Sequence, residues 1–105
     1  MENLYDILIN KGFERYVYEN QNNKVFYRRD INSNREPELL TKLYKATGED
    51  LGYFEGDLEN IICTVEITED FNFAQYLFTE KKLQFGGEAH DELTIEEFKE
   101  LLKLF

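Results

Sequence analysis

The chain has 105 residues, the size of one domain, and its 9 Phe and 7 Tyr residues supply enough apolar area for a core without a metal or a disulfide. The formal net charge is −10 and is unevenly spread, because residues 1–48 have a charge balance of +1 and residues 49–105 have a balance of −11. This charge disfavours nucleic acid and anionic membranes as partners and favours a basic protein surface.

Residues 4–11 predict a short helix. Their leucines and isoleucines recur at helical spacing, and Asn3 stands before them as an N-cap. Gly12 follows as a left-handed stop, which would let Phe13 fold back on the helix.

Residues 13–19 and 24–31 predict the two strands of a hairpin, because the loop between them is rich in asparagine, which tolerates positive φ. With a four-residue loop over residues 20–23, Arg15 would lie opposite Arg28. Opposed like charges destabilise a hairpin unless an acidic residue lies near, and the second half of the chain could supply one. The hairpin also interleaves arginines with tyrosines, a pattern that can stack nucleic-acid bases. The net charge of the chain opposes nucleic-acid binding, so we favour the alternative in which the tyrosines pack under a helix and the arginines pair with nearby acids.

Residues 37–47 predict a helix, with Pro37 at its first position and Gly48 as its stop. A strand is the alternative, since the apolar residues also alternate. Residues 61–67 predict a buried strand from their β-branched content, with Cys63 as a small buried apolar residue. A single cysteine without a secretory signal suits a reducing cytosol, so we expect a cytoplasmic protein.

Residues 71–78 fit either a strand or a helix, and the strand is weakly favoured. Residues 79–82 would turn into a short strand over residues 83–85, which two glycines would end. Residues 90–92 are predicted to be a polar loop that leads into the last helix.

The last helix has the clearest signal in the chain. Thr94 and Glu97 form a capping box, and an apolar stripe at helical spacing follows. The sequence as a whole predicts one α+β domain over residues 1–105. We expect a mostly antiparallel sheet of four to five strands, with N- and C-terminal helices and one helix between.

The sequence shows no catalytic, cofactor or metal motif. One His and one Cys cannot form a zinc site. Gly86 and Gly87 do not indicate a phosphate-binding loop, because the negatively charged Glu88 directly follows them and would repel a phosphate. Residues 55–59 carry alternate carboxylates without the EF-hand pattern, which leaves weak calcium binding as a minor alternative. We expect no enzymatic activity and no cofactor.

The longest predicted loop, residues 48–60, is the candidate interaction surface. Two aromatic residues lie among five carboxylates, a composition in which rings supply affinity and charges steer a basic partner. The candidate residues are Glu49, Asp50, Tyr53, Phe54, Glu55, Asp57 and Glu59. The alternative is a solvated loop whose rings pack into the core.

These observations predict a non-enzymatic acidic protein that occludes a basic protein surface. Immunity proteins and phage-encoded inhibitors of nucleases work in this way, and the analogy is one of size and charge alone. The alternative is a structural or assembly subunit, including a homo-oligomer. The sequence leaves the oligomeric state open.

Overall fold

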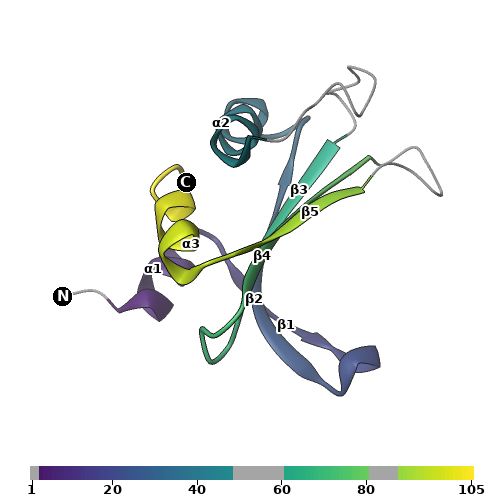
Figure 1. Cartoon of the computed structure of the whole chain (residues 1–105), viewed down its shortest axis with the longest axis vertical. Helices are drawn as coiled ribbons and strands as arrows, with labels where there is room; N and C mark the ends of the chain where they lie inside the picture. The colour runs from purple at the N-terminus through teal and green to yellow at the C-terminus, as the bar shows by residue number, and fades with distance from the viewer. Residues whose placement is uncertain (1–2, 49–60, 81–87) are drawn as a thin grey trace.

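A five-stranded antiparallel sheet with the strand order β1-β2-β3-β4-β5 organises the computed structural model, which describes residues 3–48, 61–80 and 88–105 (Figure 1). The helices of this described part are α1 (Leu4–Asn10), α2 (Pro37–Thr47) and α3 (Ile95–Leu102). The strands are β1 (Glu14–Tyr18), β2 (Lys24–Asn32), β3 (Ile61–Thr68), β4 (Ala74–Glu80) and β5 (Glu88–Leu93), and a 3-10 turn, η1 (Glu19–Gln21), follows β1. The predicted α+β class, the antiparallel sheet and the terminal helices are confirmed.

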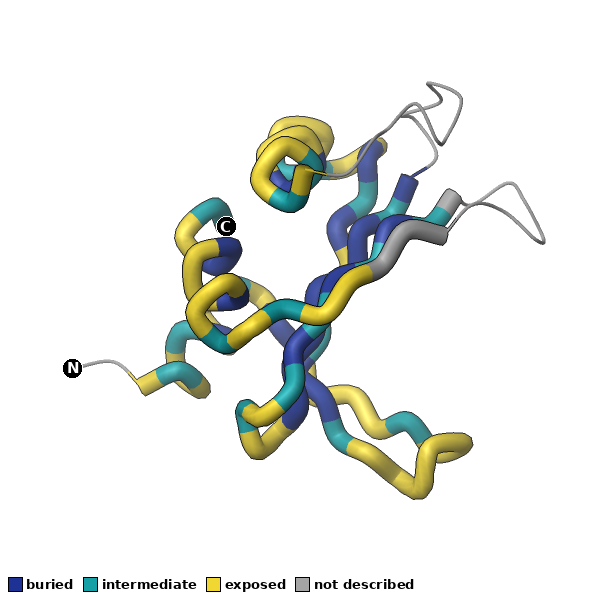
Figure 2. The backbone as a smooth tube through the Cα atoms, in the orientation of Figure 1, coloured by how far each residue is buried: buried dark blue, intermediate teal, exposed yellow. Residues whose placement is uncertain are grey.

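All three helices lie on one side of the sheet, and the core fills the space between them and the sheet (Figures 1 and 2). Burial on this side is complete for several large side chains, which include Leu8, Leu43, Ile67, Phe78 and Phe98. Cys63 belongs to the same core, as predicted. None of the helices in the described part of the chain has the length and apolar character of a bilayer-spanning helix.

The helix ends follow the capping signals of the sequence. The Asn3 side-chain oxygen accepts a hydrogen bond from the Asp6 N–H at 2.8 Å, which begins α1. Pro37 occupies the first turn of α2, and Gly48 ends this helix with a φ of +73°. The helical interpretation of residues 37–47 is therefore confirmed over the strand alternative.

The two ends of the described chain meet in the core. The Phe13 ring lies against Phe98 and Phe105, at centroid distances of 6.1 and 5.4 Å. Lys11 Nζ also donates a hydrogen bond to the main-chain oxygen of Phe105 at 2.8 Å. The segment after α1 and the end of α3 are thus parts of one packed cluster.

The predicted hairpin register is wrong by one residue. Arg15 lies opposite Tyr27, and Glu14 takes the place opposite Arg28. The shift arises because Glu19 leaves the strand and enters the 3-10 turn, which two left-handed asparagines complete. The connection therefore has five residues instead of four, and every cross-strand pair moves by one position.

The segment 71–78 forms a strand, as favoured, but this strand starts only at Ala74. A turn precedes it, in which Thr68 Oγ1 accepts hydrogen bonds from the N–H groups of Asn72 and Phe73. Phe71 has a φ of +61° there, a conformation that a bulky residue rarely adopts. An aromatic residue in a left-handed turn is the reason that the sequence pattern placed the strand start too early.

The polar loop predicted over residues 90–92 is also wrong, because these residues belong to β5. The register places Asp91 opposite Tyr76 and Glu92 opposite Gln75. Asp91 and Glu92 are exposed on this edge strand, and charged residues on an edge discourage aggregation. The predicted turn over residues 79–82 begins late as well, since β4 continues to Glu80. The strand predicted at residues 83–85 lies outside the described residues.

Candidate protein-interaction site

The seven residues of the predicted interaction surface all fall within residues 49–60, outside the described residues. The structure does describe the two ends between which this segment runs. The chain leaves α2 at Gly48 and enters β3 at Ile61. The last turn of α2, just before the segment, borders a groove that carries the same sign of charge.

This groove, the acidic groove, has a volume of about 390 Å³ and lies where the end of α2 meets β5 and α3. The described residues that line it are Ala46, Thr47, Tyr76, Asp91, Glu92, Leu93, Glu97, Glu100, Leu101 and Leu104. Four of them are exposed carboxylates, and none of these described lining residues is a lysine or an arginine. Three of the four form the rim (Asp91, Glu97 and Glu100), because the Glu92 side chain lies beside Gln75 on the other face of the sheet. The arrangement combines an apolar floor with a negatively charged rim.

The capping box of α3 fixes one rim carboxylate. Glu97 Oε1 accepts a hydrogen bond from the Thr94 N–H at 2.9 Å, and Thr94 Oγ1 accepts one from the Glu97 N–H at 3.1 Å. The hydrogen bond from the Thr94 backbone lowers the pKa of Glu97, so this side chain is ionised at neutral pH.

A lysine lies beside another rim carboxylate. Lys103 Nζ donates to Glu100 Oε1 at 2.8 Å, but both side chains are about 70 % exposed. Exposed pairs of this kind contribute little energy. Lys103 therefore reduces the negative charge at this end of the groove without abolishing it.

The arginines of the hairpin are held by acids outside the acidic groove. Arg28 contacts Asp30 at 3.1 Å, and Arg29 contacts Glu36 at 2.7 Å, both within the first half of the chain. Arg15 contacts Glu69 at 3.0 Å, so one acid of the second half does reach the hairpin, as the sequence suggested. These contacts leave the rim carboxylates of the groove unneutralised by the hairpin.

A polar network that the sequence analysis missed lies on the face of the sheet opposite the core. Its centre is Glu66 on β3, which is only 7 % exposed. The Tyr18 hydroxyl donates to Glu66 Oε2 and the Gln75 amide donates to Oε1, both at 2.5 Å. Arg28 Nη1 donates in turn to the Tyr18 oxygen at 3.1 Å, so the network joins β1 to β4. Glu66 is the single charged residue of β3, and that was the signal available in the sequence.

The Tyr18 phenol gives this network a measurable signature. Burial first, and then the Glu66 carboxylate, raises the pKa of Tyr18 to about 12. Because this pKa lies above the unfolded value of 10.0, the stability that the neutral phenol contributes is present below pH 10 and is lost as the pH rises toward 12.

We expect Tyr18→Phe to remove one phenol from those that ionise near pH 12, as followed by ultraviolet absorbance. Tyr16→Phe is the control, because Tyr16 is an exposed neighbour outside the network. An unchanged number of high-pH phenols in Tyr18→Phe would show that the hydroxyl does not contact Glu66 in solution.

The described residues also bear on catalysis and metal binding. Burial raises the pKa of the Cys63 thiol, which makes it a poor nucleophile. Among the residues that the structure describes, no three potential metal ligands gather at one point. Comparison with protein-family models, with curated proteins and with solved structures gives no match.

Proposed function

We propose that the protein is a non-enzymatic cytosolic binding protein that occludes a basic surface of another protein. The single observation that supports this proposal most is the acidic groove, where the exposed carboxylates of Asp91, Glu97 and Glu100 border an apolar floor. Buried apolar area supplies affinity at such an interface, and rim charges steer and orient the partner. In this proposal, the predicted interaction residues of the segment 49–59 contact the same basic partner.

A charge reversal tests the proposal on the partner itself. A pull-down from source cells at low salt, with mass spectrometry, is expected to capture a basic protein that high salt releases. Asp91→Lys, on the groove rim, should slow association with that protein by about threefold to tenfold at low ionic strength.

Glu19→Lys changes the net charge equally at an exposed turn outside the groove and should leave the association rate nearly unchanged. If no basic protein is captured, or if the two variants slow association equally, the proposal is wrong.

One observation favours the alternative of a self-associating assembly subunit. Strand β1 is an edge strand on which Tyr16 and Val17 are 46 % and 38 % exposed. Unpaired edges of this kind can pair with a second copy. Light scattering at low and high salt separates the two functions, since only self-association raises the mass of the pure protein.

A further inference from the structure

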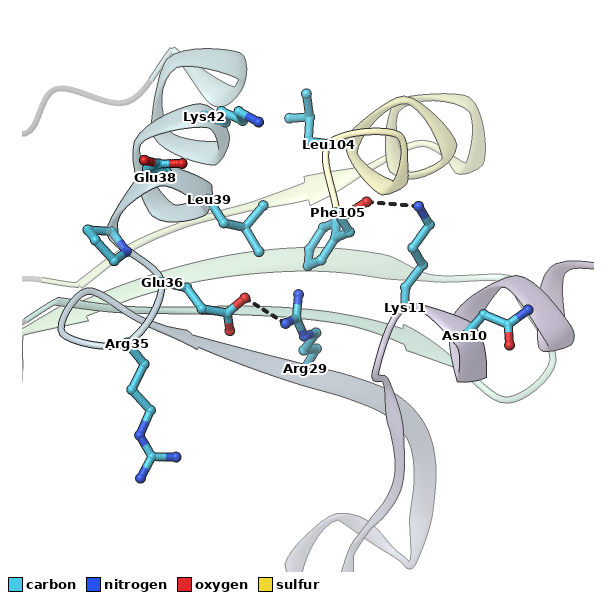
Figure 3. A pocket seen from close by; sticks show the side chains of 11 residues that line it. Asn10, Lys11, Arg29, Arg35, Glu36, Glu38, Leu39, Lys42, Leu104 and Phe105 are labelled. Carbon is cyan, nitrogen blue, oxygen red and sulfur yellow. Dashed lines mark hydrogen bonds and ion pairs between the residues drawn. The ribbon is translucent and has the colours of Figure 1, made fainter.

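A second cavity, the cationic cleft, has a volume of about 700 Å³ and lies between the end of α1, the start of α2 and the residues after α3 (Figure 3). This volume is in the range of sites for small-molecule ligands. The cleft shares the wall residue Leu104 with the acidic groove but has the opposite charge. Its described lining contains four basic and two acidic residues, in a protein whose net charge is −10.

The floor of the cleft is held in place by contacts among its own residues. Arg29 Nη2 donates to Glu36 Oε2 at 2.7 Å, and the Arg29 guanidinium lies 5.1 Å from the centroid of the Phe105 ring. Lys11 donates to the main-chain oxygen of Phe105 at 2.8 Å. Figure 3 shows these groups converging below Leu39, so that cationic groups and an apolar wall lie side by side.

Lys42 is the cation that these contacts leave available. It is exposed on α2 and makes no ion pair or side-chain hydrogen bond with another described residue. In Figure 3 its side chain extends toward Leu104, whereas Arg35 points away from the centre of the cleft. An anion at the mouth of the cleft would therefore meet Lys42 first. The positive end of the α2 dipole adds to this field.

We propose that the cationic cleft binds a small organic anion that carries an apolar group beside its charged end. The charged end would lie near Lys42 and Arg29, and the apolar group would lie against Leu39 and Phe105. The charged end of this ligand complements the cationic residues of the lining, and its apolar group complements the apolar residues.

An NMR titration of the full chain tests this proposal with three probes. Phenyl phosphate carries both features, inorganic phosphate has only the charge, and benzyl alcohol has only the apolar ring. Phenyl phosphate should shift the amide signals of residues 36–42 saturably, with a Kd of about 1 mM. The other two probes should bind at least about fivefold more weakly, because each lacks one of the two contacts. Phenyl phosphate binding should weaken as salt rises, since Lys42 is exposed.

A matched pair of charge reversals locates the site. Lys42→Glu should weaken phenyl phosphate binding by about fivefold or more, whereas Lys45→Glu should change it by less than about twofold. Both residues are exposed on α2 and both reversals give the same net charge, but only Lys42 lines the cleft. Circular dichroism verifies that both variants are folded. Absence of saturable shifts, equal weakening by both reversals, or phosphate binding as tight as that of phenyl phosphate would each overturn the proposal.

Discussion

Phe78→Ala is expected to lower the free energy of unfolding by about 3–5 kcal/mol. Phe78 is completely buried on the core side of β4, where its ring packs 5.7 Å from that of Tyr76. Truncation removes the apolar contacts and leaves a cavity that the surrounding sheet cannot fill. Domains of this size are stable by about 5–15 kcal/mol, so the variant would lose a large share of its stability. Urea unfolding followed by circular dichroism measures the loss.

Leu77→Ala serves as the control for Phe78→Ala. Leu77 is the preceding residue on β4 and lies half-buried on the opposite face of the sheet. Its truncation should cost less than about 2 kcal/mol. Equal losses for the two variants would show that the core is not on the side of the sheet that the helices cover.

Leu8→Ala is expected to cost about 2–5 kcal/mol and to release α1 from the sheet. This helix has 7 residues, and Leu8 is its one fully buried side chain. Helices this short are marginal in water, so tertiary packing must hold α1. Hydrogen exchange of the α1 amides should become fast before the rest of the domain unfolds. Because Lys11 caps α1 and lines the cationic cleft, anion binding should weaken in the same variant.

Ile9→Ala provides the comparison for α1, since Ile9 is 46 % exposed on the same helix. A change below about 0.5 kcal/mol is expected there. If α1 amides stay protected in Leu8→Ala, contacts other than this side chain anchor the helix.

The parts of the fold that the sequence predicts well depend on local chemistry. Asn3, Gly48 and Thr94 satisfy or redirect backbone groups within a few residues of themselves, and each marks a helix end in the structure. The buried strand β3 was predictable too, because its β-branched residues permit few other environments.

The parts that the sequence does not predict depend on partners that are distant in the chain. Glu19 could equally extend β1 or join the turn, and that choice sets the hairpin register. Asp91 and Glu92 lie on opposite faces of β5, so this strand lacks the alternation of apolar and polar residues by which a strand is recognised in a sequence. Its backbone hydrogen bonds with β4 hold it in the sheet instead. The Glu66 network, the acidic groove and the cationic cleft could not be predicted either, because each brings together side chains from three or more elements that are distant in the sequence.

Neighbouring strands in this sheet are also consecutive strands along the chain, so each antiparallel pair can form while the polypeptide is still being synthesised. The cluster around Phe13 behaves differently, because Phe98 and Phe105 must leave the ribosome before they can cover it. A nascent chain that stalls before α3 would therefore expose the apolar side of a nearly complete sheet. Chaperones bind intermediates that expose apolar surface in this way. The packing of α3 on the sheet would cover that surface and remove the need for a chaperone.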